Sequence, residues 1–169
     1  MSYEIKNRVA ESSLVTIDFE DFINHKKIIV FDLKMWLKDE LFLIEKDFRD
    51  QVNNHDWNNY KDHLVLIQCS NNAIIPHWAY ILISSKLKAN QINNFIGSEE
   101  DYNNYSIIKS INNIDLNDYK EKSVIVKGCS NYANKNYYYS LIVDKIQNEV
   151  KSLMYGEACS SVPIFKRRK

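Results

Sequence analysis

The chain has 169 residues, 45% of them hydrophobic, and its 22 lysines and arginines are balanced by 22 acidic residues. Such a chain can bury one sizeable core, so we expect a single domain over residues 1–169. The zero formal charge provides no overall field that would attract nucleic acid or an anionic membrane, and neither is expected as a partner. Because no export signal opens the chain and no apolar run approaches the roughly 20 residues of a membrane span, we expect a cytoplasmic protein.

The first third of the chain, residues 1–57, is expected to supply strands and a helix to this domain. The apolar, β-branched runs Leu14–Phe19 and Ile28–Asp32 predict two strands. Asp32 can cap a short helix that ends near Leu37. The segment from residue 41 to 57 has apolar residues at helical spacing and predicts an amphipathic helix.

Two later segments of the chain resemble each other. NNYKDHLVLIQCSN begins at Asn58 and LNDYKEKSVIVKGCSN begins at Leu116, and one added residue aligns Cys69 with Cys129. Each copy then continues with a helix, a strand and a glycine, and the short β-branched runs are typical of parallel strands. The pattern predicts two βαβ units, residues 58–97 and 117–165, although buried βαβ elements can also resemble each other by chance.

The fold class expected from these elements is α/β, with one mixed or mostly parallel sheet flanked by helices. The two units would contribute parallel strands at residues 64–68 and 123–127 of the same sheet. The Asn- and Tyr-rich segment 98–116 between them is expected to form a surface helix and a loop. The basic end, residues 166–169, is interpreted as a solvated terminus, with a phosphate contact as the alternative.

All three cysteines of the chain, Cys69, Cys129 and Cys159, are followed by serine. In a reducing cytoplasm an odd set of three thiols is not expected to form a disulfide framework, so the cysteines are core residues, metal ligands or reactive thiols. Ligands of parallel α/β sheets bind beyond the carboxyl ends of the strands, where these three side chains would meet if they share one sheet. The simpler interpretation is structural, because unpaired cysteine often packs as a small hydrophobic residue.

Two chemistries fit a shared thiol site. Three thiolates with His77, Glu157 or water as the fourth ligand would suit zinc or an iron–sulfur cluster, although no CxxC pair is present. Alternatively, Cys129 or Cys159 could act as a nucleophile or a sulfur carrier, with Glu157 accepting a proton. The residues expected to line the site are the neighbours of the two C-terminal cysteines, namely Lys127, Gly128, Ser130, Glu157 and Ser160.

Six runs spread over the chain carry a resemblance to a known family: NRVAESSL at Asn7, EKDFR at Glu45, HDWNNY at His55, AIIPHWAY at Ala73, KGCS at Lys127 and SLMYGEACSSVP at Ser152. Together they resemble an uncharacterised bacterial family, domain of unknown function 2480. The resemblance covers essentially the whole chain and implies no catalytic residues. It does imply a genomic association with iron–sulfur cluster assembly components, which would be the expected partners.

The sequence therefore predicts a cytoplasmic accessory protein that handles iron, zinc or sulfur at a thiol-lined site made of Cys69, Cys129 and Cys159. The alternative is a non-catalytic protein-interaction module in which the cysteines are structural. No phosphate loop, GxGxxG, HExxH or GxSxG motif occurs in the chain, so the sequence does not indicate a nucleotide-dependent enzyme, a zincin or a serine hydrolase.

Overall fold

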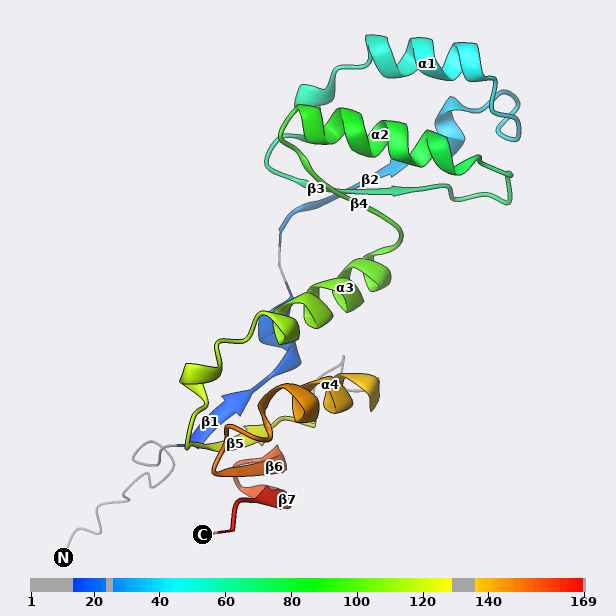
Figure 1. Ribbon diagram of the computed structural model, residues 1–169. Coiled ribbons are helices and arrows are strands. Elements are labelled where there is room, and N and C mark those ends of the chain that lie inside the picture. Colours follow the sequence, from blue (N-terminus) through cyan, green and yellow to red (C-terminus); the bar gives the residue numbers. More distant parts are fainter. Residues whose placement is uncertain (1–13, 24–25, 129–135, 169) are drawn as a thin grey trace, which may run out of the picture. The chain divides into compact units, whose positions relative to one another are not determined.

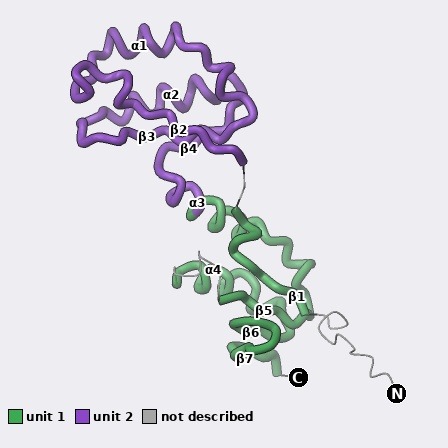
Figure 2. The backbone as a smooth tube through the Cα atoms, turned by 180° about the vertical axis from the view of Figure 1, so that it is seen from behind, with its two compact units in different colours: residues 1–24, 104–169 green, residues 25–103 purple. Residues whose placement is uncertain are grey.

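The computed structural model describes residues 14–23, 26–128 and 136–168 of the chain. The chain divides into two compact units, which Figure 2 shows in different colours. Unit 2 is the continuous segment His25–Asn103, and unit 1 combines Met1–Asn24 with Asn104–Lys169. Unit 2 is therefore inserted into the sequence of unit 1, and each unit has its own sheet and its own core.

Unit 2 is built on a three-stranded sheet in the order β2-β3-β4, in which all strands are parallel. Its helices α1 and α2 lie on the same side of that sheet in both views of the molecule (Figures 1 and 2). The elements are β2 (Ile28–Asp32), η2 (Leu33–Trp36), α1 (Glu45–Asn54), η3 (Trp57–Tyr60), β3 (Leu64–Gln68), α2 (His77–Ala89) and β4 (Asn93–Ile96), where η marks a 3₁₀ helix.

The core of unit 2 forms where α1 and α2 pack on one face of the central strand. Val65 and Ile67 of β3 are completely buried and belong to one cluster with side chains of both helices. Full burial of each such aliphatic or aromatic side chain contributes about 1.5–3 kcal/mol, so this face stabilises the unit. The helical members of the cluster are Phe48 and Val52 of α1 and Ala79, Ile83 and Leu87 of α2.

Unit 1 has a four-stranded sheet in the order β1-β5-β6-β7, parallel except for the antiparallel pair of β6 and β7 (Figure 1). Its core contains Val124 and Val126 of β5 together with Tyr138 and Ile142 of α4. The elements are β1 (Leu14–Ile17), η1 (Phe19–Phe22), α3 (Glu99–Asn112), η4 (Leu116–Asp118), β5 (Ser123–Val126), α4 (Asn136–Ile146), β6 (Ser152–Glu157) and β7 (Ser160–Lys166). The first residues of α3 belong to unit 2 and the rest to unit 1.

The two predicted βαβ units are present, as β3-α2-β4 and β5-α4-β6. They repeat one another at a constant spacing of 59 positions, which separates the first residues of β3 and β5 (123 minus 64) and those of α2 and α4 (136 minus 77). Side-chain contacts repeat at the same spacing. Lys86 Nζ donates to Asn53 Oδ1 over 3.2 Å, and Lys145 Nζ donates to the Asn112 carbonyl over 2.7 Å.

Capping and turn residues extend the repeat toward the N-terminal side of each βαβ unit. Asp56 and Asp115 cap η3 and η4 by accepting a hydrogen bond from the amide two residues later, over 3.0 and 2.9 Å. Asp62 and Glu121, each two positions before its central strand, both have a positive φ, 66° and 57°. A match in caps, turns and side-chain bonds is more than chance likeness of buried strands, and we conclude that the chain contains a structural duplication.

Three expectations from the sequence are corrected by this architecture. The strands at residues 64–68 and 123–127 do not share a sheet, because each pairs with a different N-terminal strand, β3 with β2 and β5 with β1. The constant spacing aligns Cys69 with Gly128, so the added residue that aligned Cys69 with Cys129 is wrong. The segment 98–116 is also more than a surface connection, since Ile107 and Ile111 of α3 are completely buried in the core of unit 1. The single domain expected over residues 1–169 stays a prediction.

Candidate functional site

An aspartate at the end of β2 connects the carboxyl ends of β2 and β3 in unit 2. Asp32 Oδ1 accepts a hydrogen bond from the Lys34 amide over 3.0 Å, which caps η2 as predicted, and another from the Ser70 amide over 3.1 Å. Burial would raise the pKa of Asp32, but the hydrogen bonds from Ser70 and from the Lys34 amide outweigh it, so this pKa lies below its ordinary value. The carboxylate therefore fixes the start of the Cys-Ser loop beside the end of β2.

Cys69 is the first residue after β3, and its thiol is held in place by the loop that follows. The Cys69 thiol donates a hydrogen bond to Asn71 Oδ1, with 3.0 Å between Sγ and Oδ1. The same oxygen accepts a hydrogen bond from the Ala73 amide over 3.1 Å. The side chain is half-buried and packs against the core of unit 2. Asn71 also donates to the Glu40 carbonyl, so the loop after β3 is tied to the segment that follows η2.

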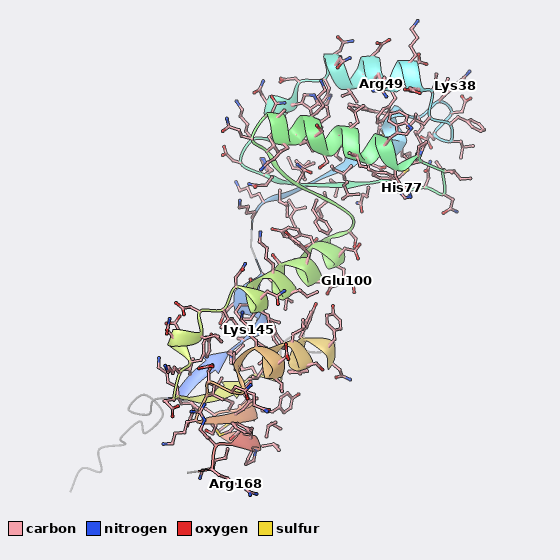
Figure 3. The ribbon with its side chains drawn as sticks, viewed as in Figure 1. Lys38, Arg49, His77, Glu100, Lys145 and Arg168 are labelled. Atoms are coloured by element: carbon pink, nitrogen blue, oxygen red, sulfur yellow. The ribbon has the colours of Figure 1, made fainter. Side chains whose placement is uncertain are left out.

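A hollow of about 600 Å³ opens at this edge, on the helix face of the sheet. Three of its side chains carry chemistry: the thiol of Cys69, the imidazole of His77 and the phenol of Tyr80. His77 is exposed and is the first residue of α2, where Figure 3 labels it. Burial, and then the nearby charges of Cys69 and Asp32, raise the pKa of Tyr80. The hollow is lined by Ile67, Gln68, Cys69, His77, Tyr80, Ile81, Ile96, Gly97 and Ser98.

The equivalent edge of unit 1 repeats the aspartate but not the thiol. Asp18, directly after β1, caps η1 through the Glu20 amide and forms an ion pair of 2.8 Å with Lys127, which follows β5. Burial opposes ionisation of Asp18, but the hydrogen bonds from Lys127 and from the Glu20 amide outweigh it, so its pKa lies below the ordinary value. In both units, then, an aspartate at the end of the N-terminal strand contacts the residues that follow the central strand.

Gly128 occupies in unit 1 the position that Cys69 has in unit 2, and a tyrosine fills the space that its missing side chain leaves. A Cβ atom on Gly128 would lie 2.5 Å from Tyr155 Cζ and 3.0 Å from Tyr155 Cε2. Tyr155 pairs with Val126 in the sheet, as Ile96 pairs with Ile67 in unit 2. The chain therefore places Gly128 and Tyr155 at one edge and Cys69 and Ile96 at the other.

The remaining predicted site residues lie in unit 1. Cys159 is exposed in the turn between β6 and β7, and the pair Glu157 and Ser160 closes that hairpin. Cys129 and Ser130 lie outside the described residues. In the part of the chain that the structure describes, no three histidine, cysteine or acidic side chains come together as a set that could hold a metal ion, and Cys69 and Cys159 belong to different units.

Sequence reasoning missed Asp32, Asn71 and Tyr80 as parts of the edge in unit 2. A signal for the first was available, because an aspartate followed by an apolar residue stands at the end of β2 and directly after β1, in Phe31-Asp32-Leu33 and Ile17-Asp18-Phe19. The buried residues Phe19 and Leu33 and the two aspartate caps show that these tripeptides have the same role. No comparable pattern in the sequence indicates that Asn71 binds the thiol.

Comparison with known families matches residues 3–167 of the chain to a family described as protein of unknown function (DUF2480). The chain belongs to this family, as the resemblance in the sequence predicted. No curated protein and no solved structure matches the chain. Among the described residues, none of the helices combines the length and the apolarity that crossing a membrane requires.

Proposed function

We propose that the carboxyl edge of the sheet in unit 2 binds a thiophilic ligand, either a zinc or iron ion or a sulfur atom, with Cys69 as the residue that takes it up. The observation that carries this proposal is that Cys69 and His77 line one hollow at the carboxyl ends of parallel strands. This is the place where α/β folds bind their ligands, because the loops there vary freely while the strands hold them in position.

The residues around Cys69 suit temporary binding better than permanent binding. A thiolate and an imidazole are both good zinc ligands, but a closed structural site needs about four protein ligands. With Cys69 and His77 alone, a metal ion would keep positions for water or for a donor and acceptor molecule. Such an open site is what a carrier of metal requires, and iron–sulfur assembly components are the partners that it would serve.

Sulfur transfer would use the same thiol. The Cys69 thiolate would attack the outer sulfur of a persulfide donor, R–S–SH, forming a persulfide on Cys69 and releasing the donor as a thiolate, R–S⁻. The exchange needs no oxidant, because the transferred sulfur keeps its oxidation state. His77, exposed beside the hollow, is the side chain that would accept the proton of the Cys69 thiol.

Protection from alkylation tests the proposal. Folded, metal-free protein purified without oxygen is treated with iodoacetamide, and modification of each cysteine is followed by mass spectrometry with and without Zn²⁺ or Fe²⁺. We expect the metal to slow modification of Cys69 at least tenfold, while Cys159, exposed on its hairpin, still reacts. Cys159 thus serves as the internal reference.

Matched variants make the test specific to the hollow. His77→Ala should abolish protection of Cys69, whereas His63→Ala, which removes a histidine before β3 whose Nδ1 lies 2.8 Å from the Lys61 carbonyl, should leave it unchanged. For sulfur, incubation with a small persulfide donor should add the mass of one sulfur atom to Cys69. If no metal protects Cys69 and no persulfide forms on it, the proposal is wrong, and the protein-interaction module is the better account.

A further inference from the structure

The opposite end of the sheet in unit 1 carries a concentration of positive charge. A hollow of about 720 Å³ there is lined by Lys151, Lys166, Arg167 and Arg168, with Glu121 as the one acidic residue. All five side chains are exposed. Arg168 follows the end of β7, where Figure 3 labels it. This group of five residues is called the basic hollow below.

Hydrogen bonds fix the basic hollow to the sheet. The Arg167 amide donates to the Lys151 carbonyl over 3.0 Å, which joins the chain after β7 to the start of β6. Arg167 also forms an ion pair with Glu121 and donates to the Asn148 carbonyl. Glu121 therefore neutralises Arg167, while Lys151, Lys166 and Arg168 have no ion-pair partner among the residues that the structure describes.

The duplication provides an internal comparison for this charge. The corresponding end of unit 2 has a hollow of about 450 Å³ lined by Asn58, Lys61, Asp62, Ala89, Asn90 and Gln91. Lys61 and Asp62 balance each other there, and unit 2 has no counterpart of β7 in its sheet of β2, β3 and β4. The positive charge of the basic hollow is thus specific to unit 1, and most of it comes with the end of β7.

We propose that the basic hollow binds a small molecule that carries a diphosphate or triphosphate group. Three cations without an acidic partner complement the three to four negative charges of such a group, at roughly one cation per charge. Arginine presents a planar fork that matches phosphate oxygens, and lysine adds a point charge. A concave site favours a compact ligand over an extended polymer, which would need a longer basic stripe.

Isothermal titration of the full-length protein with inorganic triphosphate, pyrophosphate and orthophosphate tests the inference. We expect triphosphate to bind more tightly than pyrophosphate, and orthophosphate to bind most weakly, with affinities that fall as the NaCl concentration rises. The double variant Lys166→Gln and Arg168→Gln should lose at least tenfold in triphosphate affinity. Lys61→Gln, which removes a charge from the equivalent end of unit 2, is the matched control and should bind like the unmodified protein.

The inference would be overturned by equal affinity for orthophosphate and triphosphate, by equal binding of triphosphate to the double variant, or by an equal loss in Lys61→Gln. A single-stranded RNA of ten nucleotides that binds more tightly than triphosphate and displaces it would also overturn it, in favour of a nucleic-acid surface. Because the exchanged residues are exposed, far-ultraviolet circular dichroism should show that each variant is folded. The inference is independent of the thiol chemistry proposed for unit 2.

Discussion

Replacing Gly128 by alanine tests whether Tyr155 really takes the space of a side chain at the edge of unit 1. The new Cβ would lie 2.5 Å from Tyr155 Cζ, far inside van der Waals contact. The ring has a neighbour that resists its movement, since it packs edge-on against Tyr139 with 5.4 Å between the ring centroids. Overpacking of a core costs about 1–3 kcal/mol, and the lower part of that range, about 1–2 kcal/mol, applies here because Tyr155 is 37% exposed. Loss of glycine from the unfolded chain returns about 0.4–1 kcal/mol.

We therefore expect Gly128→Ala to lower the free energy of unfolding by at most about 1.6 kcal/mol, the difference between these two effects. For a unit of this size the thermal midpoint should fall by about 4–8 °C per kcal/mol. Urea unfolding followed by far-ultraviolet circular dichroism measures the change. A second variant, Tyr155→Ile, introduces the residue type that unit 2 has at the equivalent position, Ile96. It also removes the aromatic contact with Tyr139, which contributes about 0.5–1.5 kcal/mol.

The double variant decides between steric conflict and a general intolerance of alanine. If the Tyr155 ring causes the loss, then Gly128→Ala in the Tyr155→Ile background should instead stabilise the protein by about 0.4–1 kcal/mol through the unfolded chain. The double-mutant cycle should then give a coupling equal to the steric cost, about 1–2 kcal/mol. Additive losses in the double variant would refute the steric explanation.

Two further predictions concern a histidine and a glycine. Burial, only partly opposed by the charge of Asp56, lowers the pKa of His55 below its ordinary value of 6.5. The unfolded chain therefore binds a proton at His55 more readily than the folded chain does. The contribution of His55 to the free energy of unfolding is complete above about pH 6.5 and is lost as the pH drops toward the lower pKa of the folded state. Urea unfolding followed by tryptophan fluorescence at pH 7.5 and 5.5 should show this loss, and His55→Phe should reduce it. Gly156 has a φ of 116°, and a Cβ there would lie 2.6 Å from the Ser160 carbonyl oxygen. Gly156→Ala should therefore lower the urea midpoint by more than Gly128→Ala does. An unchanged midpoint would contradict this interpretation of the hairpin.

Local structure was predictable from the sequence where one segment alone determines it. The strand Ile28–Asp32, the cap by Asp32 and both βαβ units appear as predicted. Helix α1 lies within the segment 41–57, where the apolar spacing predicted a helix. In each of these cases hydrophobic periodicity or a single side-chain hydrogen bond decides the outcome.

Pairing between distant segments was not predictable in the same way. Strands β1 and β2 are both short and apolar, and nothing in their composition determines which of them pairs with β3 and which with β5. The alignment of Cys69 with Cys129 was wrong for a related reason. The repeated Cys-Ser pair and the unbroken spacing of 59 positions, as between Leu64 and Ser123, give two different registers, and composition does not decide between them. Caps and positive φ values, which the sequence shows only weakly, establish the correct register.

The duplication explains why the chain repeats a motif and yet offers different chemistry at its two sheet edges. Both edges keep an aspartate, but unit 2 combines Cys69 with Ile96, whereas unit 1 combines Gly128 with Tyr155. The larger of the two strand residues, Tyr155, thus occurs together with glycine, which has no side chain. If this compensation governs both edges, Ile96→Tyr alone should destabilise unit 2 by about 1–3 kcal/mol through the clash with Cys69. Adding Cys69→Gly should then recover most of the loss, because it recreates the arrangement of unit 1. All three tryptophans lie in unit 2, so the urea midpoint of tryptophan fluorescence measures both variants, and a double variant no more stable than Ile96→Tyr would show that the two edges do not follow one rule.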